Sequence, residues 1–245
     1  MNTERNHPFK EIFGRARISI DIDGVVCLIE IPATEKFNNY FGTSKTPLDV
    51  SGWNTVSNWA RDEFLKRGFT IDKAMEAADR YDRSMWLDKD IYRRAPLAPG
   101  ADIFILRLMS LGIPFDFITS RDPLLTDVTL EWFGAKLPMV DPSQIFINTN
   151  PSVLGHDFKV GKIDERGIGL HIDDYDEHGR LILKNTFASV VLLCGTHGTD
   201  LKHPRLTRIE IPGRQATLRD FHKRVLLNPH LLNVAQSIDN TPSLG

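Results

Sequence analysis

The sequence has little of several features that would define a protein's setting. Its 245 residues include only two cysteines, Cys27 and Cys194, and these form no metal-ligand motif. We therefore expect reduced thiols in a hydrophobic core, without a disulfide framework. No apolar run reaches the length of a membrane span, and residues 1–17 are too polar for a signal peptide. These absences predict a soluble, cytoplasmic protein with no membrane partner.

The chain also has little net charge. Its formal net charge is −2, with 25% charged and 41% hydrophobic residues, which predicts one sizeable core plus an accessory unit. This near-neutral balance disfavours nucleic acid as a partner. A basic stretch, residues 201–224, is a local exception, and it is either a solvated face or a contact surface for an acidic partner. Nothing here predicts an oligomeric state.

A short β-branched run at 17–22 leads into two carboxylates, Asp21 and Asp23, followed by Gly24. Because strand side chains alternate between faces, both carboxylates are expected to project the same way. Two like charges that close require a cation between them or a proton on one of them. Phosphoryl transfer through an aspartyl phosphate meets both conditions. One Asp attacks while a metal cation screens its charge, and the other Asp exchanges a proton.

The character of the chain changes twice and a loose tail follows, so we divide the chain into four parts. We expect an N-terminal arm, first strand and flap at 1–32, a helical cap at 33–95, the rest of the core at 96–235, and a loose tail at 236–245. The flap is predicted at 25–32, an apolar run closed by Pro32. Caps and stop residues predict cap helices at 34–40, at 57–67 between Ser57 and Gly68, and at 71–81 after Thr70.

After residue 96, helical and strand patterns alternate. We expect strands at 113–119, 144–148, 168–172, 188–193 and 206–211, and helices at 101–111, 122–133 with a stop at Gly134, and 159–166. Such alternation predicts an α/β fold, with a doubly wound parallel (Rossmann-like) sheet and a helical cap inserted after the first strand.

Three strand ends carry unusual polar groups. Asp21 and Asp23 follow the first strand, residues 119–121 (Thr-Ser-Arg) the second, and Asp173 and Asp174 the strand at 168–172. In an open parallel sheet the ligand crevice lies beyond the carboxyl ends of the strands, so these groups are expected to meet there.

These segments resemble the motifs of the haloacid dehalogenase-like (HAD) phosphohydrolases. Residues 21–24 resemble the first motif and 117–120 the second, Lys159 matches the third-motif lysine, and residues 173–174 resemble the fourth-motif acids. The helical insertion between the first two motifs is where one class of HAD cap is found. The resemblance covers residues 17–193.

The resemblance implies a role for each acid. Asp21 would be the nucleophile and a metal ligand, and Asp23 the acid/base, with its backbone carbonyl on the metal. Asp173 and Asp174 would complete the shell of a Mg²⁺ cofactor, a hard cation that prefers carboxylate and water ligands.

The remaining site residues would hold the substrate. The resemblance implies that Thr119, Ser120 and Lys159 bind the phosphate. Lys162, one helical turn on, is the alternative lysine, although the spacing to Asp173 favours Lys159.

An arginine, a tryptophan and several histidines are further candidates for the site. Arg121 either contacts substrate or pairs with a cap carboxylate, and Trp53 is a candidate substrate contact from a glycine-containing loop. The histidines, including His171 and His178, show no metal-ligand spacing and are predicted to be structural or exposed.

The sequence thus predicts a Mg²⁺-dependent phosphatase that hydrolyses a small phosphomonoester. The helical cap, the Pro-Gly-Ala at 99–101 and the Thr-Ser-Arg at 119–121 resemble those of cytosolic deoxyribonucleotidase-type 5′-nucleotidases, which makes a (deoxy)nucleoside monophosphate one candidate substrate. The alternatives are a polynucleotide-end 3′-phosphatase of the same superfamily and a non-catalytic HAD-like binding protein.

Overall fold

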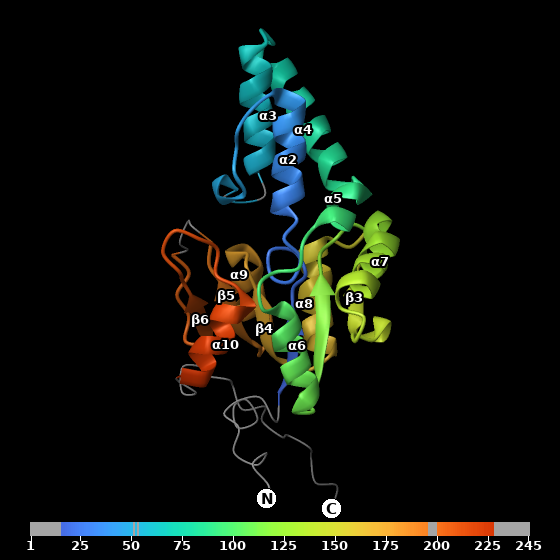
Figure 1. Cartoon of the computed structure of the whole chain (residues 1–245), viewed down its shortest axis with the longest axis vertical. Coiled ribbons are helices and arrows are strands. Elements are labelled where there is room, and N and C mark those ends of the chain that lie inside the picture. The colour runs from blue at the N-terminus through green and yellow to red at the C-terminus, as the bar shows by residue number, and fades with distance from the viewer. Residues whose placement is uncertain (1–15, 51, 53, 196–199, 228–245) are drawn as a thin grey trace, which may run out of the picture.

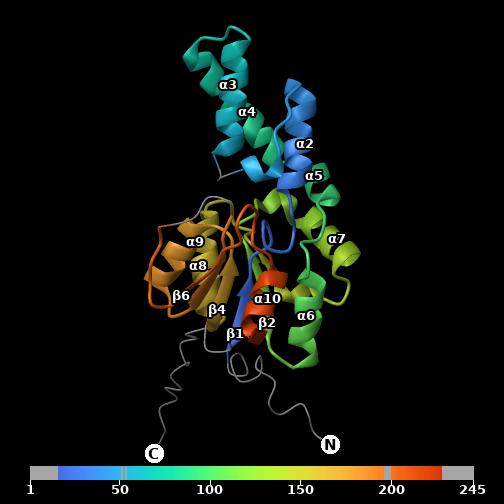
Figure 2. The ribbon, with the colours of Figure 1, turned by 60° about the vertical axis from the view of Figure 1, so that its left-hand side comes forward.

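The computed structural model describes residues 16–50, 52, 54–195 and 200–227, and it has two parts, a core built on a β-sheet and a helical cap beyond it (Figures 1 and 2). All six strands of the sheet are parallel, in the order β3-β2-β1-β4-β5-β6. The α/β class with a doubly wound parallel sheet is therefore confirmed. The strands are β1 (Arg17–Ile20), β2 (Phe115–Thr119), β3 (Ile145–Ile147), β4 (Ile168–Asp173), β5 (Ser189–Leu193) and β6 (Leu206–Ile209).

Helices cover both faces of the sheet. Phe104 of α6, Phe133 of α7 and Phe221 of α10 share one hydrophobic cluster with Ile18 and Ile20 of β1. Helices α8 and α9 contribute to a second cluster, which includes Val190 and Leu192 of β5. The core helices are α6 (Ala101–Ser110), α7 (Thr126–Lys136), α8 (Gly155–Glu165), α9 (Asp176–Asn185) and α10 (Leu218–Leu227), with short 3₁₀ turns η2 (Pro123–Leu125) and η3 (Pro142–Gln144).

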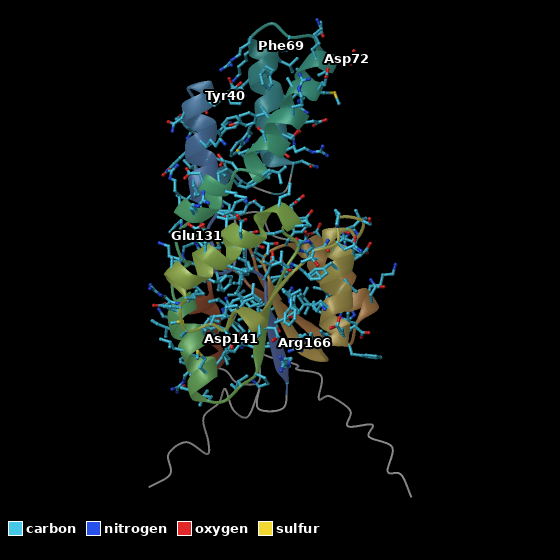
Figure 3. All side chains as sticks on the ribbon, turned by 90° about the vertical axis from the view of Figure 1, so that its right-hand side faces the viewer. Tyr40, Phe69, Asp72, Glu131, Asp141 and Arg166 are labelled. Atoms are coloured by element: carbon cyan, nitrogen blue, oxygen red, sulfur yellow. The ribbon has the colours of Figure 1, made fainter. Side chains whose placement is uncertain are left out.

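The cap follows β1 and is entirely helical. It consists of α2 (Glu30–Phe41), η1 (Pro47–Asp49), α3 (Thr55–Lys66), α4 (Ile71–Trp86) and α5 (Lys89–Arg94). Phe37 is fully buried at its centre, with ring centroids 5.3 Å from Trp59 and 6.0 Å from Tyr81. Figure 3 shows Phe69 and Asp72 at the outer end of the cap, away from the core. The aromatic residues thus form the cap's own core.

The flap predicted at 25–32 extends too far. Residues 24–26 form a turn, Cys27 bridges Asp23 and Leu97, and α2 already begins at Glu30. Pro32 lies in the first helical turn, where a missing N–H removes no helical hydrogen bond. The proline is therefore part of a helix and does not close the flap.

Several helix limits also differ from the prediction; helix α8, for example, begins at Gly155 and not at Lys159. Helix α3 begins at Thr55, before Ser57, and the Ser57 hydroxyl bonds to Asp79 of α4 instead of capping its own helix. Gly134 lies inside α7 and does not end it. The buried Trp132 and Phe133 next to it anchor the last turn against the sheet, which outweighs the cost of a helical glycine of about 1 kcal/mol.

Two further predictions are confirmed. Thr70 precedes α4 as expected, and both cysteines are free and buried. Across the part of the chain that the structure describes, no helix is long and apolar enough to cross a membrane.

Candidate active site

A cavity of about 820 Å³ lies between the cap and the carboxyl ends of the strands. The core contributes polar residues to its wall, and the cap contributes mostly apolar ones. From the core come Asp21, Asp23, Ser120, Asp174 and His178, and from the cap come Ile31, Leu48, Val50 and Trp86. The three polar strand ends therefore meet at one site, while Thr119, Lys159 and Asp173 are buried side chains that do not line the cavity.

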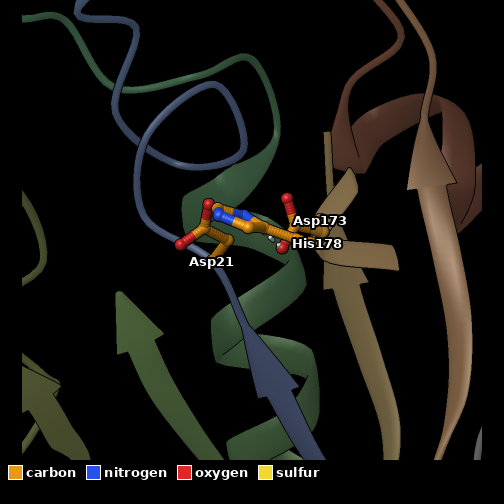
Figure 4. A group of neighbouring side chains, drawn as sticks. All are labelled: Asp21, Asp173 and His178. Atoms are coloured by element: carbon orange, nitrogen blue, oxygen red, sulfur yellow. Dashed lines mark ion pairs between the residues drawn. The ribbon is translucent and has the colours of Figure 1, made fainter. Parts of the chain in front are cut away.

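Lys159, on α8, lies at the centre of this site. Its Nζ is 2.8 Å from Asp173 Oδ2, 3.0 Å from Asp21 Oδ1 and 3.0 Å from His178 Nδ1. Figure 4 shows those three partners converging from β1, β4 and α9. The side chain is only 1% exposed, and the two acids keep its pKa raised although burial opposes this. The ammonium therefore neutralises two buried carboxylates.

Asp173 is held by hydrogen bonds on both oxygens. Besides Lys159, Oδ2 lies 2.9 Å from His171 Nε2, and Oδ1 accepts the backbone N–H groups of Asp174 and Tyr175. Burial opposes its ionisation, but Lys159 holds the pKa of Asp173 well below its usual range. This carboxylate is a fixed anion that orients Lys159.

His171 lies beneath Asp173 on β4. Burial lowers the pKa of His171 to about 4, so the ring is neutral near pH 7. Its Nδ1 is 2.7 Å from the Ser19 hydroxyl of β1. With Nε2 donating to Asp173, Nδ1 accepts from Ser19, and the chain of hydrogen bonds is complete.

Asp21 and Asp174 differ from Asp173, because their pKa values are raised and not lowered. Burial, with Asp173 nearby, raises the pKa of Asp21 to about 6, and burial and Asp173 raise that of Asp174 well above its usual range. Asp21 Oδ1 is buried and, although close to Lys159, accepts no aligned hydrogen bond from any residue that the structure describes. Two neighbouring carboxylates with raised pKa values form a donor pair whose ionised state a cation would stabilise.

The donor set fits Mg²⁺, because it offers carboxylate oxygens beside an open cavity. Asp21, Asp173 and His178 place ligand atoms within 4.8 Å of one another, but the Lys159 ammonium already contacts all three. We therefore favour Asp21 and Asp174 as the side chains that would hold the metal, because both oxygens of Asp173 already have donors.

Gly24 allows Asp174 to occupy this position. Its φ is +71°, and a methyl group on its Cα would overlap the Asp174 carboxylate. The turn after Asp23 therefore requires glycine both for its backbone and for the space that it leaves.

Gly24→Ala should displace Asp174 and weaken Mg²⁺ binding by about 10–100-fold, with a parallel loss of turnover, since Asp174 would no longer be oriented. Titration of the metal followed by fluorescence or calorimetry measures this. Gly42→Ala is the matched control, because Gly42 has φ +73° but nothing within 4 Å of its added methyl group. It should cost about 1–2 kcal/mol of stability and leave metal affinity unchanged. Equal affinities for the two variants would contradict the role given to Gly24.

The end of β2 supplies two hydroxyl groups. Thr119 is buried, and its Oγ1 accepts the backbone N–H of Arg121 at 3.3 Å. Ser120 lines the cavity, and the first residue of α8, Gly155, approaches it so closely that an added Cβ would lie 2.8 Å from the Ser120 carbonyl oxygen. A side chain at 155 would push α8, and with it Lys159, away from the site.

Asp23 is paired with Arg121. The guanidinium Nε donates to Asp23 Oδ2 at 2.9 Å, and Nη2 donates to Oδ1. The partner of Arg121 is thus a core carboxylate, and none of the cap carboxylates in the described chain pairs with it. Trp53, the other candidate substrate contact, lies outside the described residues.

Sequence patterns did not indicate three of the residues at this site. His178 contacts Lys159, His171 supports Asp173, and Glu30, at the start of α2, lines the cavity with its pKa raised to about 7 by burial. Only Glu30 had a local signal, as the single acid in the apolar run at 25–32. The histidines act through contacts that sequence spacing does not encode.

Comparison with solved structures identifies the fold. The chain is similar to a HAD family hydrolase from Deinococcus radiodurans R1 with bound phosphate and sodium, at 16% identity and a TM-score of 0.52, covering 94% of this chain and 100% of that one. A phosphonoacetaldehyde hydrolase-like protein from Oleispira antarctica is similar at 16% identity and a TM-score of 0.50, covering 74% of each chain. No protein-family model and no curated protein matches the sequence. The chain has the fold of the HAD hydrolases.

Proposed function

We propose that the protein is a Mg²⁺-dependent phosphatase that hydrolyses a small phosphomonoester through an aspartyl phosphate on Asp21. The observation that carries this proposal is the placement of Asp21, a buried carboxylate that faces the cavity, next to the Lys159 ammonium and Asp174. A nucleophilic carboxylate beside a dianionic phosphate needs compensating positive charge, and this site is built to supply it.

Each half-reaction uses the acids that line the cavity. Asp21 attacks phosphorus, the bond from phosphorus to the leaving oxygen breaks, and Asp23 gives its proton to that oxygen. Asp23 then takes a proton from water, which attacks phosphorus and breaks the bond to Asp21. Phosphate leaves, and both acids return to their starting states.

The other residues of the site bind and orient. Lys159 balances charge on the phosphate and on Asp21, and the hydroxyl of Ser120 at the cavity wall is a donor to a phosphate oxygen. Thr119 shapes the strand end behind it. Asp21 and Asp174 would hold Mg²⁺, which would supply charge neutralisation for the incoming phosphate.

The cavity supports a leaving group larger than a simple alcohol. Its volume of about 820 Å³ falls in the range of about 300–1,000 Å³ that holds drug-sized ligands. The apolar cap side chains Ile31, Leu48 and Trp86 face this space, which suits a sugar or nucleoside. A nucleoside monophosphate therefore remains our candidate substrate.

A polynucleotide end is the less favoured substrate, because the formal net charge of the chain is −2 and part of the basic stretch at 201–224 makes contacts within the protein. Arg208 and Arg214 pair with Glu210 and Asp220, and Arg205 donates to the backbone carbonyls of Thr186 and Ala188. Arg214 and Arg219 also line the cavity, where their charge suits the phosphate of a small substrate as well as that of a polynucleotide end.

Phosphate release from a panel of nucleoside and sugar monophosphates, with and without Mg²⁺, tests the proposal. We expect metal-dependent release from at least one class. An end-phosphorylated oligonucleotide as the only substrate, with release that weakens steeply with salt, would favour the alternative. Mg²⁺ binding without any release would favour the non-catalytic binding protein.

The raised pKa values of Asp21 and Asp174 predict a pH-dependent effect of the metal on stability. A carboxyl whose pKa is higher in the folded state stabilises the fold fully only when the pH is below its pKa in the unfolded state, which is 3.8 for Asp21. This stabilisation is lost as the pH rises through the folded-state pKa of about 6. Mg²⁺ should offset that loss, so it should raise the melting temperature much more at about pH 8 than at about pH 5. Thermal melts with and without Mg²⁺ measure this.

Asp174→Asn should remove most of the Mg²⁺ effect at the higher pH. Asp72→Asn, at the outer end of the cap, is the control and should keep it (Figure 3). An equal Mg²⁺ effect at both pH values would show that the metal does not bind at these carboxylates.

A further inference from the structure

Arg121 is enclosed on every side at the junction of core and cap. Its side chain is 1% exposed, Nη1 donates to Thr129 Oγ1 at 2.9 Å, and Nε and Nη2 both donate to Asp23. Its Cζ lies 4.7 Å from the ring centroid of Tyr92, on α5 of the cap. Because the guanidinium is buried and does not line the cavity, it contacts Asp23 and does not contact a substrate in the cavity.

The Nε and Nη2 donors of Arg121, which together form a fork, fix both the position and the plane of the Asp23 carboxyl. Two donors of one planar group define both the position and the plane of a carboxylate, which a single ammonium does not. The Asp23 side chain remains 21% exposed, and Asp23 lines the cavity. The carboxyl is therefore anchored from behind and open toward the place where a leaving group would lie.

We infer that Arg121 is a positioning residue for Asp23, holding the proton donor toward the leaving-group oxygen, and that Tyr92 links this orientation to the cap. The inference rests on the proposed phosphatase function, because it gives Asp23 the role of proton donor. It makes leaving-group chemistry depend on a residue that does not touch the substrate.

The test compares two esters that differ in their need for an acid. A p-nitrophenolate departs without a proton, whereas the alkoxide of a sugar or nucleoside phosphate needs one. For Arg121→Met we expect kcat/KM to fall about 100-fold on the best alkyl phosphate of the panel, the scale of general acid catalysis, and much less on p-nitrophenyl phosphate. Arg121→Lys keeps the charge but not the two-pronged donor group. Its kcat/KM on the alkyl ester should lie between the values for Arg121→Met and the wild type.

A double-mutant cycle adds a readout that a purely structural role would not change. If Arg121 acts through Asp23, Arg121→Met should cost little on the alkyl phosphate once Asp23→Asn is present. Equal losses on both esters, together with additive losses in the cycle, would overturn the inference and leave Arg121 a structural residue.

Tyr92 gives a second route, in case Arg121→Met does not fold. Tyr92→Phe keeps the ring beside the guanidinium, whereas Tyr92→Leu removes it. The leucine variant should show the same dependence on leaving group, and the phenylalanine variant should not. A wild type that hydrolyses neither ester would remove the proposed function and this role with it. A wild type that hydrolyses both, with equal losses in the variants, would remove only this role.

Discussion

Asp21→Asn is expected to lower turnover by about 10⁴-fold or more, because the variant lacks the carboxylate that attacks phosphorus. The amide has nearly the same shape, so Lys159, Asp173 and the cavity should remain in place. Initial rates of phosphate release at saturating Mg²⁺ measure the loss.

This variant should remain folded, which separates the loss of activity from a loss of structure. Burial raises the pKa of Asp21 to about 6, so an ionised Asp21 destabilises the metal-free fold near neutral pH and a neutral amide does not. We expect a melting temperature without Mg²⁺ that is equal to or higher than that of the wild type.

Asp116→Asn is the matched control. Asp116 is also buried, near the start of the neighbouring strand β2, but it pairs with Arg17 and Arg166. Figure 3 shows Arg166 at the end of the sheet away from the cap. It should lower stability and keep turnover. Full activity in Asp21→Asn would contradict the assignment of the nucleophile.

Lys159→Met is expected to have the second largest effect. It removes the one ammonium that contacts Asp21, Asp173 and His178, and leaves two buried acids without their cation. We expect kcat/KM to fall about 10³-fold, together with a loss of about 3–5 kcal/mol in the free energy of unfolding. Steady-state kinetics and urea denaturation measure the two effects.

Lys162→Met decides between the two lysines that the sequence left open. Lys162 is three residues away on the same helix but pairs with Glu165 at 2.7 Å, and its Nζ lies 5.4 Å from the Phe146 ring centroid. Removing it should cost about 1 kcal/mol or less and leave the kinetics unchanged. Loss of activity in Lys162→Met, with activity kept in Lys159→Met, would reverse the assignment.

The convergence of the strand ends was predictable because it follows from local pattern and topology. Strands β1, β2 and β4 are marked by short β-branched and aromatic runs, and parallel strands end at one edge of the sheet. Asp21, Ser120 and Asp174 follow those runs directly. The sheet therefore brings them together regardless of the details of the connecting helices.

The division of labour between Asp173 and Asp174 was not predictable. The two acids are adjacent in sequence, yet Asp173 has donors on both oxygens, whereas Asp174 lies against Gly24. Their difference arises from groups on other elements, such as His171, which is supported in turn by Ser19, 152 residues away. Such long-range side-chain contacts leave no periodic signal in the sequence.

The pairing of Asp23 with Arg121 shows the same limit. The two residues are 98 positions apart in the sequence. Local pattern identifies Asp23 only as an acid after one strand and Arg121 only as a residue after another. Their contact depends on the register of β1 with β2, and on Thr129 and Tyr92, which close around the guanidinium.

The central claim is that phosphate passes through Asp21, and trapping that intermediate tests it most directly. The protein is mixed with Mg²⁺ and substrate, quenched in acid within one turnover, and treated with borohydride, which reduces an acyl phosphate to an alcohol. We predict homoserine in place of aspartate at position 21, dependent on Mg²⁺ and on substrate. Homoserine at another acid, or none during full phosphate release, would contradict the account.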